Sequence, residues 1–175
     1  GTRNGIADYV GDVWKWMSGL RIYKGEIQIF VGNLAAKQVS HLAASTYWKA
    51  ILPNGSLVEP GTPGTLKYTK DFKIATDTGA AGSTYTANFG NLVAGTGVTT
   101  IPEILKELFL APVSGVTHTG AFWINNEDER LPIVSGSSYD TSDAGPSALY
   151  LSNPRSSVRA RIGFFSAFME LESAI

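Results

Sequence analysis

Residues whose types and spacing could support catalysis are few in this sequence. His41 and His118 lie 77 positions apart, and no carboxylate cluster at metal-ligand spacing accompanies either of them. Solitary histidines are usually ordinary hydrogen-bonding residues. The chain has no cysteine, which excludes disulfides, thiolate metal sites and thiol nucleophiles. We therefore predict no catalytic residue, no enzymatic activity and no cofactor.

The acidic run at residues 125–129 carries oxygen atoms of the kind that bind calcium. Its spacing matches no defined calcium loop, so we favour a solvated turn, and calcium binding is the alternative. Trp14, Trp16 and Trp123 could present flat faces to a ligand. We interpret these tryptophans as packing residues, because alternate positions of an extended segment place one ring inward. We predict no metal site.

Residues 130–168 have a composition that suits recognition better than catalysis. They include no Lys, Glu, Gln, Met or Trp, although these types supply 24 of the other 136 residues. At that rate about seven would be expected in 39 positions. Randomising the adenines of Asn codons yields codons for Tyr, Asp, Ser, Asn, Arg, Val, Ala, Phe or Pro, but never for the five missing types. The composition therefore indicates a deliberately diversified surface.

A fixed-looking frame runs through this segment, with mixed polar residues between its members. The frame consists of Gly136, Ala144-Gly145, Ala148-Leu149, Leu151, Arg155-Ser156 and Ile162-Gly163-Phe164. This pattern resembles the variable region of phage and bacterial proteins that are diversified by retroelements. Residues 4–16, NGIADYVGDVWKW, resemble that family's signature DGI-D-L-x-G-N-V-W-E-W, with Asp12 and Lys15 in the usual places of Asn and Glu. Segments at 20–29, 48–52 and 100–105 resemble a phage branch of the family, so the resemblance covers nearly the whole chain.

The resemblance implies a ligand-binding face made of exposed, exchangeable positions. By positional match these are Ser137, Ser138, Tyr139, Asp140, Asp143, Ser147, Tyr150, Ser152, Asn153, Val158, Arg159, Ala160 and Arg161. Tyrosine offers contact area at low entropic cost, and Ser, Asn, Asp and Arg offer adaptable hydrogen bonds, as in antibody paratopes. The buried frame is expected to hold the backbone. A polar loop that serves only solvation is the alternative.

Three departures from the family pattern lie in or next to this segment. Relatives usually have Arg-Gly-Gly where this chain has Val134-Ser135-Gly136. They have Trp at the position of Ser138 and Arg at the position of Phe165. The diversified window is therefore either wider than assumed or altered in this copy.

Composition limits the class of protein further. With 43% hydrophobic and 17% charged residues, the chain is expected to form a single domain over residues 1–175. Its formal charge of −1 argues against nucleic acid as a partner. No apolar run reaches the roughly 20 residues that cross a bilayer, so no membrane insertion is predicted. Relatives have upstream sequence, which leads us to expect a C-terminal fragment of a longer chain.

Local patterns predict the elements that would position these residues. Residues 26–31 alternate as in a half-buried strand, with Ile27 and Ile29 on one face. The turn residues at 53–56 between two apolar stretches predict a hairpin, and Ser40 could alternatively cap a helix. Residues 60–63 and 79–97 are expected to be loops or short irregular strands.

Two further elements are expected in the second half of the chain. Thr100 and Glu103 form a possible capping box with Pro102 in the first turn, which predicts a helix to about Leu110. Its apolar positions, at 101, 104, 105, 108 and 109, should form one buried stripe. Residues 162–171 are apolar and predict a buried closing strand.

The resemblance implies an α+β, C-type-lectin-like domain of the formylglycine-generating-enzyme type, with irregular loops and a small antiparallel sheet. It implies a ligand-binding domain of a phage tail-tip or fibre protein that recognises a host-cell surface protein or glycan. The location would be the virion, assembled in the bacterial cytoplasm beside other tail subunits. Whether the domain is monomeric or trimeric stays open.

Three alternatives remain from the sequence. A bacterial surface protein bearing the same domain would be displayed on the cell and would need an export signal upstream. A formylglycine-generating-enzyme-like oxidase would need the active-site cysteines that this chain lacks. A purely structural virion protein would use the variable-looking segment only to contact neighbouring subunits.

Overall fold

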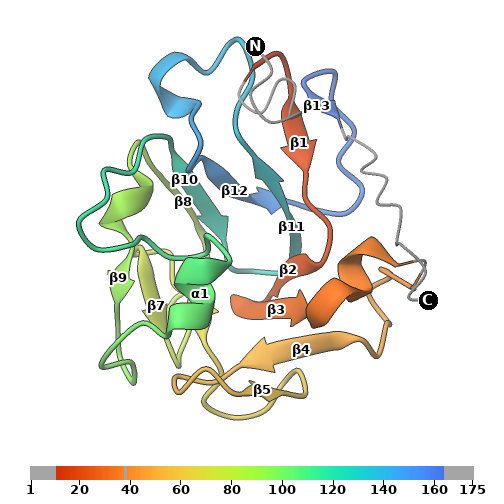
Figure 1. Cartoon of the computed structure of the whole chain (residues 1–175), viewed down its shortest axis with the longest axis vertical. Coiled ribbons are helices and arrows are strands. Elements are labelled where there is room, and N and C mark those ends of the chain that lie inside the picture. The colour runs from red at the N-terminus through yellow and green to blue at the C-terminus, as the bar shows by residue number, and fades with distance from the viewer. Residues whose placement is uncertain (1–10, 38, 164–175) are drawn as a thin grey trace, which may run out of the picture.

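The computed structural model describes residues 11–37 and 39–163. In these ranges the chain forms thirteen β-strands, one α-helix and three short 3-10 helices (Figure 1). The strands are β1 (Trp14–Trp16), β2 (Leu20–Tyr23), β3 (Glu26–Phe30), β4 (Trp48–Ile51), β5 (Leu57–Val58), β6 (Lys67–Tyr68), β7 (Lys73–Ala75), β8 (Ser83–Thr86), β9 (Val93–Ala94), β10 (Phe122–Asn125), β11 (Glu129–Val134), β12 (Leu149–Asn153) and β13 (Ile162–Gly163). The helices are η1 (Gly32–Ala36), η2 (Phe89–Asn91), α1 (Glu103–Glu107) and η3 (Thr141–Asp143).

The strands form one curled, mixed sheet. Nine of them follow one another in the order β8-β10-β12-β11-β2-β3-β6-β7-β9 and make a half-barrel. The pairs β10–β12, β7–β9 and β1–β13 are parallel, and the other strand pairs are antiparallel. Strand β11 links the upper and lower parts seen in Figure 1, because Glu129 and Arg130 pair with β2 while Ile133 and Val134 pair with β1 and β12.

The predicted α+β, C-type-lectin-like fold with a small antiparallel sheet is wrong. The chain is mostly β, with 32% strand and 9% helix, and its sheet is large and mixed. No helix forms in the described residues between η1 and β4, where Ser40 was a possible helix cap. The α+β class was carried over from the resemblance, whereas the sheet is built by pairing between short strands that lie far apart in the chain.

Helix α1 is shorter than predicted. It covers Glu103–Glu107, and its N-cap is Pro102, which makes no side-chain capping bond. The expected capping box with Thr100 is therefore wrong. Phe109 adopts a positive φ of 57°, a conformation that ends the helix, and its side chain is 76% exposed. Of the expected buried stripe, Leu105 is buried and Ile101 and Ile104 are half-buried, whereas Leu108 and Phe109 are exposed.

Strand β3 and the β4–β5 hairpin occur where the sequence predicted them. All five residues of β3 are buried, so the expected half-buried strand is buried on both faces. Glu26 is stabilised there by hydrogen bonds from Gln28, Thr65 and the backbone amide of Gly61. The hairpin turn contains Gly55 with a φ of +85°, as the turn residues indicated.

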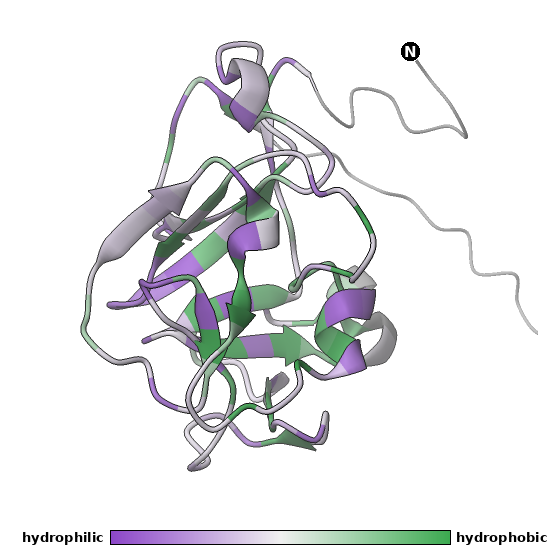
Figure 2. Cartoon of the chain, turned by 90° about the vertical axis from the view of Figure 1, so that its left-hand side faces the viewer, coloured by the Kyte–Doolittle hydropathy of each residue, from purple (hydrophilic) through white to green (hydrophobic). Residues whose placement is uncertain are grey.

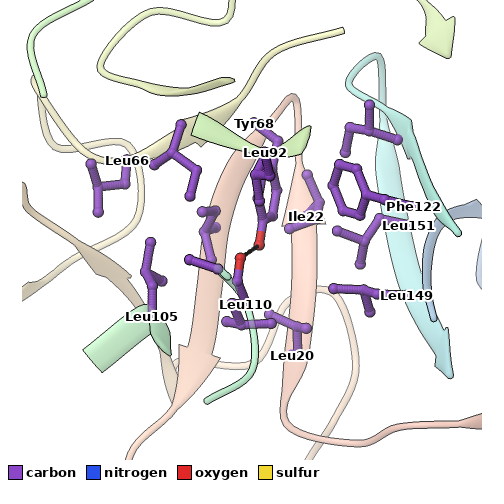
Figure 3. Close-up of a cluster of buried hydrophobic side chains, with 14 of the residues drawn as sticks. Leu20, Ile22, Leu66, Tyr68, Leu92, Leu105, Leu110, Phe122, Leu149 and Leu151 are labelled. Carbon is purple, nitrogen blue, oxygen red and sulfur yellow. Dashed lines mark hydrogen bonds between the residues drawn. The ribbon is translucent and has the colours of Figure 1, made fainter. Parts of the chain in front are cut away.

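The main core packs α1 against the sheet. Figure 3 shows Tyr68 at the centre of this cluster, with Leu105 of α1 on one side and Phe122 and Leu151 on the other. The Tyr68 hydroxyl donates a hydrogen bond of 2.5 Å to the carbonyl oxygen of Leu110, and burial raises the pKa of this phenol. Figure 2 is coloured by hydropathy. Hydrophobic stretches lie mainly on the inner strands, and hydrophilic stretches lie on outer loops.

The predicted closing strand is described only at its start. Strand β13 pairs in parallel with β1, and residues 164–171 of the prediction lie outside the described residues. Residues 4–10 of the N-terminal signature also lie outside them. Among the helices of the described ranges, none has the length and apolar character needed to cross a bilayer.

Candidate functional site

An open hollow of about 660 Å³ lies over one face of strands β8, β10 and β12. The strand register explains its floor. Trp123 of β10 is paired with Tyr85 of β8 on one side and with Tyr150 of β12 on the other. Since side chains at paired positions project from the same face of a sheet, the three rings form an aromatic row.

The aromatic row continues through direct ring contacts. Trp123 meets Tyr85 edge-to-face at 5.7 Å between ring centroids and meets Tyr150 in the same way at 5.5 Å. Tyr150 in turn stacks on Trp14 of β1 at 4.1 Å. Trp14 is buried, whereas Trp123 is 38% and Tyr85 40% exposed. The row therefore passes from the core at Trp14 to solvent at Tyr85.

A second row, of polar residues, lies two positions along the same strands and on the same face. Ser83 of β8 is paired with Asn125 of β10, and Ser152 of β12 also lines the hollow. The indole N–H of Trp123 donates to the Ser83 hydroxyl at 2.9 Å. On the opposite face of these strands, Phe122 and Leu151 pack into the core. The alternation along each strand thus separates the hollow from the core.

One wall of the hollow is the loop at residues 137–143. Asp140 holds this loop in place, because its carboxylate accepts a 2.8 Å bond from the Trp14 indole N–H and a 2.8 Å bond from the Ser137 amide. The Ser137 hydroxyl donates to the same oxygen. At the end of the loop, η3 carries Asp143 to the rim. Asp140 therefore links the loop to the aromatic row.

The other wall is the loop at residues 154–161, which leads into β13. Arg155 anchors it through two bonds of 2.9 and 2.8 Å to the carboxylate of Glu129, and donates to the His41 carbonyl oxygen. Arg159 and Arg161 then line the hollow. The guanidinium of Arg161 lies 5.3 Å from the ring centroid of Tyr139, so the two walls approach each other there.

Carboxylates make the rim of the hollow locally negative beside the tyrosines. A hydrogen bond with Asp143, with lesser contributions from burial and Asp140, raises the pKa of Tyr85 to about 12. Burial, and then the charge of Asp143, raises the pKa of Tyr150. Both phenols are therefore neutral at ordinary pH and act as hydrogen-bond donors and acceptors rather than as bases.

Seven residues selected from the sequence line this hollow: Asp140, Asp143, Tyr150, Ser152, Asn153, Arg159 and Arg161. The structure thus brings together positions spread over two loops and one strand. The expected exposure is wrong for Asn153 and Ser137, which are buried. Ser137 serves the Asp140 turn instead of facing solvent.

The remaining predicted residues lie around or away from the hollow. Ser138 and Tyr139 are exposed beside it, and Val158 and Ala160 are exposed on the other loop, with Val158 at 95%. Ser147 lies apart from the lining residues, where its hydroxyl is 3.3 Å from Nδ1 of His118. The structure therefore joins most of the predicted positions but not all of them.

The expected burial of the frame is confirmed for part of it and is wrong for Arg155 and Ser156, which are exposed. The buried ones are Gly145, Ala148, Leu149 and Leu151. Ile162 is half-buried, and Phe164 lies outside the described residues. Gly145 is required by close approach, because a Cβ there would lie 2.7 Å from the carbonyl oxygen of Thr119.

Sequence reasoning missed the contribution of β8 and β10. Tyr85 was placed in an irregular segment, and Trp123 was interpreted as a packing residue. Trp123 does pack between two tyrosines, but its exposed surface also lines the hollow. In residues 122–125, apolar Phe122 and Ile124 alternate with Trp123 and Asn125, which was an available signal. Residues 83–86, STYT, show no such alternation.

The other chemical candidates lie elsewhere. The ring of His41 packs 4.7 Å from that of Phe30, and His118 packs against Phe89. In the acidic run, Glu129 is engaged with two arginines. Across residues 11–37 and 39–163, no group of three or more His, Cys, Asp or Glu side chains is placed to hold a metal ion.

The lining groups are phenols, indoles, hydroxyls, amides, carboxylates and guanidiniums. Together they supply flat faces and hydrogen-bond partners of both kinds, which suits reversible binding of a ligand. Comparison with models of known protein families and with curated proteins found no match.

Proposed function

We propose that this chain is a ligand-binding domain of a phage tail tip or fibre, and that the hollow over β8, β10 and β12 recognises a molecule of the host-cell surface. The observation that carries the proposal is the convergence described above. Residues between Asp140 and Arg161 that were predicted by positional match to a variable region line one open hollow together with an aromatic row. No reaction is proposed for this site.

The two loops suit a surface that changes its ligand without unfolding. Their exposed residues, such as Tyr139 and Val158, contribute little to the core. The buried neighbours Leu149 and Leu151 lie on the strand between the loops and hold the backbone. Substitution at exposed positions is usually within about 0.5 kcal/mol of neutral. We propose that a retroelement supplies this variation, as the codon pattern of residues 130–168 indicates.

Modest affinity at each site would be sufficient in this role. Several copies displayed on one particle raise the effective concentration of the remaining sites once the first has bound. We propose that the domain also contacts the neighbouring tail subunits in such an assembly.

Deep sequencing of this gene from a propagated population tests the proposal. We expect substitutions to concentrate at adenines in codons for the exposed loop residues between Ser138 and Arg161, and to spare the codons of Leu149 and Leu151. The matched internal control is the segment of β8 and β10, which should vary no more than the rest of the gene. Substitutions spread evenly over all codons would contradict diversification of this face.

Host attachment provides the second test. Replacing Tyr139, Tyr150 and Arg159 together should abolish adsorption of assembled particles to cells, because two of these residues line the hollow and the third borders it. Particle yield should be unchanged. Loss of assembly with normal adsorption of the remaining particles would instead indicate a purely structural virion protein.

A further inference from the structure

We propose that the hollow holds an uncharged saccharide ring against the exposed surface of Trp123, with Tyr85 beside it. This inference rests on the proposed function and names the class of ligand. The stacking platform, Trp123 and Tyr85, belongs to β10 and β8, which lie outside residues 130–168.

The platform is preorganised by its neighbours. Tyr85 and Tyr150 contact Trp123 edge-to-face from both sides and hold the indole in one orientation. The Trp123 N–H is already bonded to Ser83, so the exposed part of the ring offers mainly apolar surface. An aromatic face carries partial negative charge, which attracts the weakly positive C–H groups of a sugar ring.

Side chains that can form hydrogen bonds with the hydroxyl groups of a saccharide lie next to Trp123. Asn125 and Ser152 occupy the polar row on the floor of the hollow. The Asn125 side-chain oxygen accepts from the Glu127 amide, which leaves the Asn125 amide group to donate. The Ser152 hydroxyl can both donate and accept. A saccharide ring with an apolar face and equatorial hydroxyls can stack on Trp123 and form hydrogen bonds with Asn125 and Ser152 at the same time.

Charge balance argues for an uncharged ligand. Among the lining residues, the carboxylates of Asp140 and Asp143 are offset by the guanidiniums of Arg159 and Arg161. Asp140 is occupied by the Trp14 indole, and Asp143 accepts from the Tyr85 hydroxyl. A strongly cationic or anionic ligand would therefore meet a site without net formal charge.

The dimensions favour a small ring over a protein surface. A volume of about 660 Å³ falls within the roughly 300–1,000 Å³ of small-ligand sites. A stable protein partner would need about 800 Å² of contact on each side, most of it outside this concave region. The structure therefore points to the saccharide part of a cell-surface polymer.

The codon pattern indicates that Trp123 is retained when the loops vary. Tryptophan is one of the five types absent from residues 130–168, so the diversified segment does not supply the largest flat side chain. Trp123 lies before that segment and provides it from β10. Every variant of the loops would thus retain the same stacking surface, while the loops select among sugars.

The test measures adsorption of assembled particles to host cells after periodate, which cleaves vicinal diols of sugars, or after protease. We expect periodate to abolish adsorption and intact protease-treated cells to retain it. Trp123→Ala and Tyr85→Ala should each weaken adsorption to untreated cells by about tenfold or more, as for aromatic hot spots. Trp123→Phe should retain part of it.

Tyr47→Ala is the matched control, because Tyr47 is 41% exposed, close to the value for Tyr85, and does not line the hollow. It should adsorb normally. Adsorption that survives periodate overturns the saccharide, and if protease then abolishes it, the ligand is a protein and the proposed function stands. Normal adsorption by correctly folded Tyr85→Ala and Trp123→Ala variants overturns the platform. Absence of adsorption to any host cell by the unaltered particle overturns the proposed function itself.

Discussion

Ser135 is a residue whose local conformation conflicts with its side chain. It has a φ of +82°, in the region that favours glycine, and its hydroxyl is buried without a hydrogen-bond partner. A side chain in this conformation costs on the order of 1 kcal/mol, and a buried unpaired hydroxyl adds a similar amount. The residue connects β11 to the loop that forms one wall of the hollow.

We expect Ser135→Gly to raise the free energy of unfolding by about 1 kcal/mol, because it removes both penalties and costs only part of that gain in chain entropy. Urea unfolding of the purified chain measures this change. Ser135→Ala is the control, since it removes the hydroxyl but keeps a Cβ at positive φ, and it should stabilise less. A glycine variant no more stable than the alanine variant would show that backbone strain is unimportant there.

At the scale of elements, Glu129 connects three parts of the chain. It begins β11, and its carboxylate is 3.0 Å from Arg21 of β2 and 2.8 Å from Arg155 of the 154–161 loop. Arg155, and then Arg21, hold the pKa of Glu129 below its ordinary value despite partial burial, which acts in the opposite direction. The same ion pairs therefore fasten one wall of the hollow to the sheet.

The stability of this junction should depend on pH. Because the folded pKa of Glu129 is below its unfolded value of about 4.3, its stabilisation is fully present above that pH and is lost as pH falls through the folded pKa. We expect Glu129→Gln to lower the free energy of unfolding at pH 7 by about 3 kcal/mol, since Arg21 stays buried without its partner. The difference from the wild type should narrow toward pH 3.

Glu127→Gln is the control for this measurement, because Glu127 is exposed and lies 3.9 Å from Arg130. Such surface pairs contribute about 0–1 kcal/mol. If the difference in the free energy of unfolding between wild type and Glu129→Gln stays constant from pH 7 to pH 3, the ionised carboxylate has no stabilising role.

At the scale of the whole molecule, one sheet serves two purposes. The inner face of β10 and β12 contributes Phe122 and Leu151 to the core, while the outer face carries Trp123 and Tyr150 into the hollow. Alternation along each strand keeps the two sets apart within one residue of each other. Binding residues can therefore change while the packing that supports them does not.

This division predicts opposite costs for adjacent substitutions. We expect Leu151→Ala to lower the free energy of unfolding by about 2–5 kcal/mol, because it removes buried contacts and leaves a cavity. Ser152→Ala, one position along, should change it by less than about 0.5 kcal/mol. Thermal or urea unfolding of both variants gives the comparison, and similar costs for the two would contradict the separation of faces.

Several local elements could be predicted from the sequence. The alternation at 26–31, the turn residues around Gly55 and the apolar frame at Leu149 and Leu151 predicted a strand, a hairpin and buried positions that the structure contains. These features depend on residues close in the chain, so their patterns are visible without knowledge of the fold. The loop residues from Tyr139 to Arg161 were chosen by positional match to the variable region that this segment resembles.

The fold class and the floor of the site depend on contacts between segments that are distant in the chain. The order of strands depends on pairing between distant segments, which local periodicity does not encode. The α+β prediction came from the resemblance, and no local pattern was available to correct it. The same long-range register sets Tyr85 and Trp123 beside Tyr150. It also buries Ser137 and Asn153, for which the resemblance implied exposure. Side-chain type indicated what could bind, whereas strand register determined which side chains meet.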